Sequence, residues 1–168
     1  MNNIGGGGVP GLEEVWDKLL SGGSMVYGMA TDDAHVFKEP GNPMVSGLGR
    51  GWVMVRAPRL DAGALMQSLE RGDFYASTGV VLDDVIATER NLSVKIKTEG
   101  VFKYRVQFIG RGGQMLTEVA EPSATYAFRG DEGYAWDGRR RFSSRGWSVI
   151  VHGNSGGGSG GRETQSCV

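Results

Sequence analysis

Hydrophobic and polar residues follow two different periods along this chain, and the change of period divides it into two parts. Between residues 11 and 72, apolar positions recur about every 3.6 residues or form short continuous runs, which indicates helices and buried strands. From residue 73 to residue 152, apolar and polar residues tend to alternate one by one, as in strands with one buried face. The pattern therefore predicts an α+β protein.

The first part of the pattern predicts two helices and two strands. The apolar residues of the first helix fall on one stripe, and we expect this helix to end at Gly22. Residues 25–30 form a short apolar run, as in a strand that is buried on both faces. A second strand is expected over residues 52–57, and a second helix from Asp61, whose carboxylate can cap it, to Gly72. The apolar stripe of the first helix consists of Leu12, Val15, Trp16, Leu19 and Leu20, and the side chains predicted to face inward on the second helix are Ala62, Leu65, Met66 and Leu69.

The second part predicts a series of short strands. Turn residues separate them at short intervals, among them Glu99–Gly100, Gly110–Gly113 and Asp137–Gly138. Short antiparallel strands at this spacing are typical of a β-sandwich. The strands are expected over residues 74–77, 80–87, 92–96, 104–109, 115–119 and 124–128, with a last one around residues 147–151.

Two glycine-rich segments at the ends fall outside this pattern. Glycine accounts for 29 of the 168 residues, and it crowds residues 1–10 and 153–161. Such segments bury no apolar surface, so we expect a leader over residues 1–10 and a flexible linker and tail over residues 153–168. The predicted order is therefore leader, α/β part (residues 11–72), antiparallel β domain (residues 73–152) and tail.

Charge and cysteine content exclude several classes of function. The net charge is −1, which argues against a nucleic-acid-binding protein, and the arginines between Arg139 and Arg145 are expected to form a solvated turn. No apolar run approaches the roughly 20 residues of a membrane span. Cys167 is the single cysteine, so neither an intrachain disulfide nor a cysteine zinc site can form. These features favour a soluble protein of a reducing compartment such as the cytoplasm.

The strongest chemical signal follows the apolar run at residues 25–30. Asp32, Asp33 and His35 lie at the expected carboxyl end of a buried strand, where α/β folds place their active sites. In an extended segment Asp33 and His35, two positions apart, point to the same side. A carboxylate beside an imidazole suits Zn, Mn or Fe. The alternative is a purely structural role, in which these residues only form turns and caps.

A resemblance to a known family also points to metal binding by this segment. Trp16–Asp17, a Leu-rich turn, and the stretch from Val26 to His35 resemble the last metal-binding motif of the polymerase-and-histidinol-phosphatase (PHP) hydrolases. Further matching stretches follow in family order, and the branch that looks most similar is the CehA/McbA-like metallohydrolases. The resemblance covers roughly residues 5–134. Its later motifs are Gly49 to Val55, Gly72 to Gly79, Phe108 to Gly110, and the stretch to Gly133–Tyr134.

The resemblance implies a distorted β/α barrel with divalent metals at its mouth, followed by a β segment without chemistry. The metals would activate a water that attacks an ester, carbamate or phosphoester. Asp33 and His35 would be metal ligands, and Asp32 would be a carboxylate outside the ligand set that steadies the loop. The implied fold is thus a remnant of a PHP-type barrel joined to a sandwich-like β domain.

The chain departs from the family where most of the metal ligands should lie. The family needs a His-x-His pair and further His, Asp or Glu ligands from earlier strands, whereas this chain has His35 and His152 alone. The sequence also leaves the family pattern after Tyr134, as an artificial junction, a frameshift or a truncation would cause. We therefore expect the C-terminal portion of a hydrolase, inactive by itself, which binds one metal or none.

Two other interpretations stay open. Asp33 and His35 could bind a metal that a partner chain completes, or the chain could be a binding or scaffold module. For the latter, Ser166 and Val168 match the C-terminal pattern that PDZ domains capture by strand addition. A barrel without its preceding strands would also expose an edge and an apolar face, so we expect self-association, as a dimer.

Overall fold

The computed structural model describes residues 11–24, 26–39, 42, 44–100, 102–130 and 132, and it describes residues 12, 13, 148–155 and 166–167 by their backbone alone. Helices and small antiparallel sheets make up these residues, so the α+β class is confirmed. The elements are α1 (Leu12–Ser21), β1 (Trp52–Val55), α2 (Ala62–Arg71), β2 (Phe74–Ser77), β3 (Leu82–Ala87), β4 (Asn91–Ile96), β5 (Phe102–Gly110), the 3₁₀ turn η1 (Arg111–Gly113), β6 (Gln114–Val119), β7 (Ser123–Ala127), β8 (Ser148–Ser155) and β9 (Ser166–Cys167).

Helix α2 begins and ends as the sequence predicts, but it buries a different face. The Asp61 carboxylate accepts a hydrogen bond from the Ala64 amide (2.9 Å), and Gly72 ends the helix in the left-handed conformation. The buried positions are Ala64 and Ser68, whereas Ala62 and Met66, which were expected to face inward, are exposed. The predictions for Ala62 and Met66 were wrong because neighbouring elements, and not the apolar stripe alone, decide which face of a helix is covered.

The predicted strand at residues 25–30 is a further correction, since the described residues 26–30 form no strand. Side-chain hydrogen bonds hold this segment instead. The Val26 carbonyl accepts from the Trp16 indole (2.8 Å), and the Tyr27 hydroxyl donates to the Arg71 carbonyl (3.1 Å). A strand exists only where a neighbouring strand takes up its backbone hydrogen bonds, and no strand in the described part of the chain pairs with this segment.

Strands β1 and β2 pair with each other in antiparallel orientation, with Trp52 opposite Ser77 and Val55 opposite Phe74. A β/α barrel is built from parallel strands. The order β1, α2, β2 is the one that the sequence predicts. The two strands, however, are antiparallel, whereas neighbouring strands of a β/α barrel are parallel.

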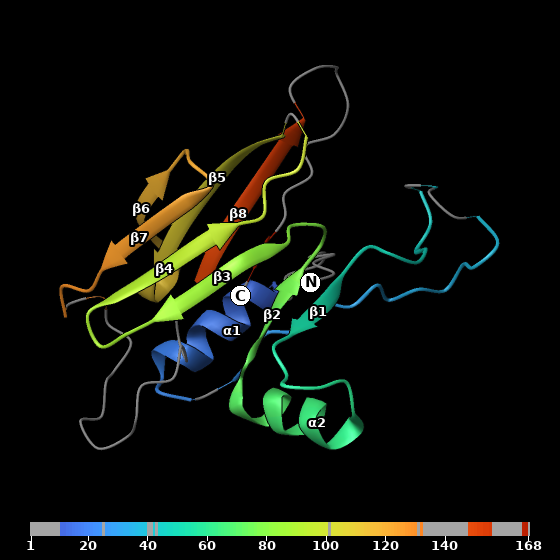
Figure 1. The fold of residues 1–168 in the computed structure, drawn as a ribbon, viewed down its shortest axis with the longest axis horizontal. Coiled ribbons are helices and arrows are strands. Elements are labelled where there is room, and N and C mark those ends of the chain that lie inside the picture. Colours follow the sequence, from blue (N-terminus) through green and yellow to red (C-terminus); the bar gives the residue numbers. More distant parts are fainter. Residues whose placement is uncertain are drawn as a thin grey trace.

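The β domain consists of two sheets that pack face to face, as Figure 1 shows. One sheet has the order β3-β4-β7 and the other the order β6-β5-β8-β9. The alternation predicted for β4 is confirmed, because its buried side chains are Leu92, Val94 and Ile96. Across the core, the Phe108 ring of β5 stacks on the Tyr126 ring of β7 with centroids 5.6 Å apart. This core gives the domain its stability.

Helix α1 docks on this sandwich through one carboxylate. Asp17 accepts hydrogen bonds from the backbone amides of Gly112 (2.9 Å) and Gly113 (3.3 Å), which form the η1 turn between β5 and β6. In Figure 1 the helix lies beside the sheets. The α/β part and the β domain are thus joined by contacts between residues that lie far apart in the sequence.

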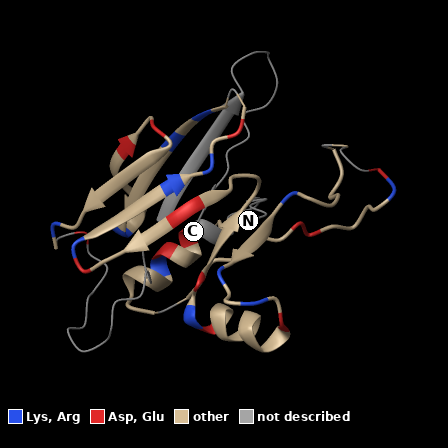
Figure 2. Ribbon diagram, viewed as in Figure 1, with Lys and Arg blue, Asp and Glu red and all other residues tan. Residues whose placement is uncertain are grey.

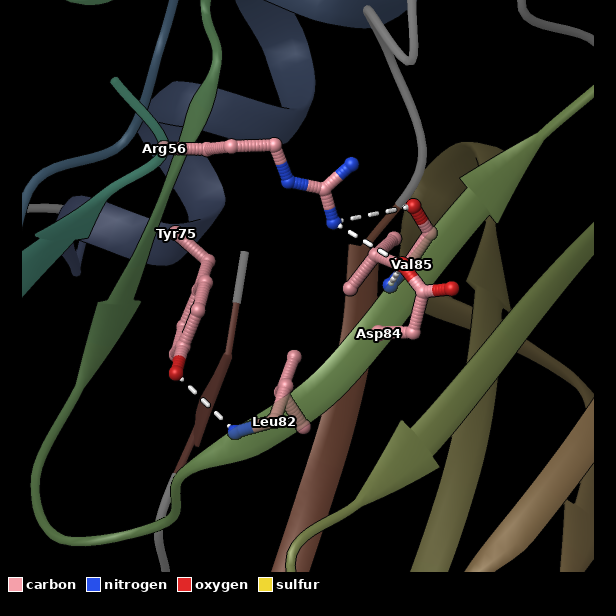
Figure 3. Close-up of polar contacts among 5 residues, drawn as sticks. All are labelled: Arg56, Tyr75, Leu82, Asp84 and Val85. Carbon is pink, nitrogen blue, oxygen red and sulfur yellow. Dashed lines mark hydrogen bonds and ion pairs between the residues drawn. The ribbon is translucent and has the colours of Figure 1, made fainter. Parts of the chain in front are cut away.

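A second set of contacts fixes the β1–β2 pair to the sandwich (Figure 3). Just after β1, the Arg56 guanidinium donates to the Asp84 carboxylate (3.0 Å) and to the Val85 carbonyl (3.4 Å) of β3. The Tyr75 hydroxyl of β2 accepts from the Leu82 amide (2.9 Å). Because these contacts come from both strands of the pair, they orient the pair as a unit.

The C-terminal part differs from the predicted linker. Strand β8 pairs with β5 as far as Ser155, and β9 pairs with β8, with Ser166 opposite Ile150. Backbone hydrogen bonds do not require apolar side chains, so residues of this composition can still extend a sheet. The predicted leader, the Asp137–Gly138 hairpin, the cluster from Arg139 to Arg145, and Val168 lie outside the described residues.

Charged residues of both signs are interspersed over the described part of the chain (Figure 2). Within that part, each of the two α-helices is ten residues long, too short to cross a bilayer.

Candidate metal site

The candidate site lies on a long connection between α1 and β1, which we call the arm (residues 32–39 and 44–50). It extends away from the sheets in Figure 1. Its two sides are joined where the Ser46 carbonyl accepts from the amides of His35 (2.8 Å) and Val36 (3.0 Å). The arm is therefore a hydrogen-bonded loop, and it exposes the side chains of Asp33 and His35 to solvent.

Asp32 closes the base of the arm. Its carboxylate accepts from the backbone amides of Arg50 (2.6 Å) and Gly51 (2.8 Å). The Gly51 amide, and then those of Gly49 and Arg50, hold the pKa of Asp32 below its usual value, because these hydrogen bonds favour the charged form. Asp32 therefore steadies the loop.

We predict that the base of the arm opens only in strong acid. Because the folded pKa of Asp32 is lowered, its contribution is fully present above the ordinary aspartate value of about 3.9 and is lost as the pH falls through the lower folded value. The Gly51 amide shift, followed by NMR from pH 7 downward, should titrate with a midpoint below about 3.9. In Asp32→Asn this transition should be absent, and a wild-type midpoint at or above the ordinary value would contradict the assignment.

Asp33 and His35 lie side by side, as their spacing predicts. The His35 Nε2 atom is 3.6 Å from the Asp33 Oδ1 atom, which is too long for a good hydrogen bond. An ion about 2.0–2.2 Å from both atoms, with tetrahedral angles, would separate them by roughly 3.4 Å. The two donor atoms are thus spaced to occupy two positions around one such ion.

The backbone at Asp33 supports a special role for this residue. Its φ angle is 50°, and it is the one non-glycine residue with positive φ in the described part of the chain. Aspartate tolerates this conformation better than most residues, but it still costs free energy. Strain of this kind is often found where a side chain must be aimed at a ligand.

The number of donors does not fit a catalytic metal cluster. No group of three or more His, Cys, Asp or Glu side chains that could hold a metal ion exists among the described residues. Catalytic zinc sites have three protein ligands and an open position for water. Asp33 and His35 therefore fit part of one coordination shell, and we derive no catalytic step through a metal.

Other residues of interest have structural roles. The Ser77 hydroxyl is buried, donates to the Val80 carbonyl (2.6 Å) and accepts from the Gly79 amide (3.0 Å), so it forms a turn. Glu132, which the sequence did not single out, is buried and accepts from the Tyr126 hydroxyl (3.1 Å). Burial raises the pKa of Glu132, but backbone amides, led by that of Arg129, outweigh this effect and lower it.

The tail residues of the PDZ-ligand pattern are only partly described. Ser166 lies in β9, where its backbone is paired with β8. A PDZ domain needs the backbone of a terminal segment to be available for its own sheet edge. In this structure that segment would first have to leave β8.

Comparison with known proteins adds no relative. No protein-family model matches the chain, and neither a curated protein nor a solved structure matches it.

Proposed function

We propose that this chain is a portion of a PHP-like, CehA/McbA-like metal-dependent hydrolase that acts on esters, carbamates or phosphoesters. Asp33 and His35 are two ligands of a divalent Zn, Mn or Fe ion. By itself the chain is inactive, because two ligands do not hold a catalytic cluster. The observation that carries the proposal is the 3.6 Å separation between the carboxylate and imidazole donor atoms.

The order of the motifs and the backbone at Asp33 support the proposal. The run of motifs from Trp16 onward keeps the family order, and the positive φ of Asp33 marks the same residue as the motif does. The antiparallel pairing of β1 and β2 departs from a parallel barrel.

We predict that His35→Ala removes metal uptake. Elemental analysis after dialysis against Zn should find at most one ion per chain in the wild type and almost none in His35→Ala, since one remaining carboxylate is a poor zinc site. The matched control is His152→Ala, which changes the only other histidine and should leave the metal content unchanged. Equal metal content in all three proteins would refute the site.

Activity should be absent in all these samples. Ester, carbamate and phosphoester substrates, tested with the metal-loaded chain alone, should show no turnover above background. Turnover that disappears in His35→Ala would mean instead that the remaining ligands are present in this chain.

A further inference from the structure

The Asp33–His35 pair leaves half of a zinc coordination shell unfilled. Zinc in structural sites takes four ligands in tetrahedral arrangement, and the described part of the chain brings two donor atoms together on the arm. We propose that a second copy of the chain supplies the other two, so that one divalent ion bridges two arms through two aspartates and two histidines. This inference rests on the proposed function, because it uses the same pair as metal ligands.

The position of the pair makes such a bridge accessible. The side chains of His35 and Asp33 are 71% and 55% exposed, and they lie on an arm that extends away from the sheets (Figure 1). A two-fold axis through the ion would present the same pair from each copy, as in any isologous dimer. The bridge therefore needs no rearrangement of the core.

The arm that carries the pair also carries exposed apolar side chains. Phe37, Met44 and Leu48 are 65%, 88% and 62% exposed. The hydrogen bonds from His35 and Val36 to Ser46 place the two sides of the arm next to each other, and both sides carry these apolar residues. Contact between two arms would remove part of this apolar surface from water, which favours association.

Charge makes the association depend on the metal. The described arm residues include three acidic side chains (Asp32, Asp33 and Glu39) and two basic ones (Lys38 and Arg50). Two arms that meet at their Asp33 carboxylates bring like charges together, which opposes contact. A divalent cation between these carboxylates reverses the sign of the interaction. The second copy thus binds through the ion, and the apolar residues add to that contact.

The test is light scattering on the full chain, first after dialysis against EDTA and then with zinc chloride added in equal amount to the chain. We expect a monomer in EDTA and, with zinc, twice that mass with one zinc per two chains. Asp33→Ala and His35→Ala should each stay monomeric with zinc. His152→Ala should dimerise like the wild type. Thermal unfolding of each variant checks that it is folded.

Three results would overturn the inference, and they separate it from the proposed function. One zinc per chain at monomer mass, lost in His35→Ala, would leave the metal pair intact and remove the bridge. A dimer that forms equally in EDTA and in His35→Ala would show association without a bridging ion. No zinc uptake by the wild-type chain would overturn both the bridge and the metal pair.

Discussion

Replacing Phe108 by alanine should destabilise the protein by about 3–5 kcal/mol, the usual cost of removing a buried aromatic side chain. Phe108 is 1% exposed and is the largest fully buried side chain among the described residues. It touches both sheets, because it projects from β5 and stacks on Tyr126 of β7. Its removal leaves a cavity at the point where the two layers meet.

Urea unfolding followed by circular dichroism measures this loss. Small domains are stable by about 5–15 kcal/mol, so the variant should unfold at a much lower urea concentration. The matched control is Phe102→Ala on the same strand, whose ring is 47% exposed and which should cost less than about 1 kcal/mol. Equal losses in the two variants would mean that the sheets do not share this core.

Replacing Gly72 by alanine should cost about 2–4 kcal/mol, from two independent sources. The residue ends α2 with a φ angle of 75°, a conformation that a residue with a Cβ atom adopts at a cost. A Cβ atom there would also lie 2.4 Å from the Cε1 atom of Tyr27. The Tyr27 ring cannot retreat freely, because it packs on Phe74 and its hydroxyl donates to the Arg71 carbonyl.

Gly23→Ala is the matched control for Gly72→Ala. Gly23 has a φ angle of 85° just after α1, and a Cβ atom there would meet no heavy atom within 4 Å. It should therefore show the backbone cost alone, about 1 kcal/mol. In a Tyr27→Ala background, the cost of Gly72→Ala should fall to the Gly23→Ala value, as a double-mutant cycle would measure. If the cost does not fall, the Tyr27 ring does not cover Gly72.

The candidate site was predictable to the extent that it is local. Asp33 and His35 are two residues apart, so the sequence could place them near each other, but their side chains meet with Asp33 in the left-handed region (φ 50°) and not in the predicted extended segment. The amides of Arg50 and Gly51, which donate to Asp32, lie 18 and 19 residues after it in the sequence. The local sequence around Asp32 does not predict that the chain returns to this point. Any further metal ligand beside Asp33 and His35 would likewise come from a segment distant in the sequence, so its approach depends on the tertiary structure.

In the fold, too, features set by the local sequence were predictable, and features set by distant segments were not. The apolar periods, the Asp61 cap and the glycine ends predict α1, α2 and most of the strands, because these features act within one turn or one strand. The run at residues 25–30 has the composition of a strand but pairs with no strand in the described part of the chain, and α2 buries Ser68 instead of Met66. The composition of a segment limits the secondary structure and the buried face that it can adopt, whereas the segments packed against it decide which of these it adopts.

The sequence by itself determined the α+β class, the ends of both helices and the alternation in β4. Each of these depends on interactions between residues a few positions apart. Only the tertiary structure decided the antiparallel pairing of β1 with β2, the docking of α1 through Asp17, and the exposure of the arm. These depend on hydrogen bonds and apolar contacts between segments far apart in the chain, which form only when the whole set of elements packs together.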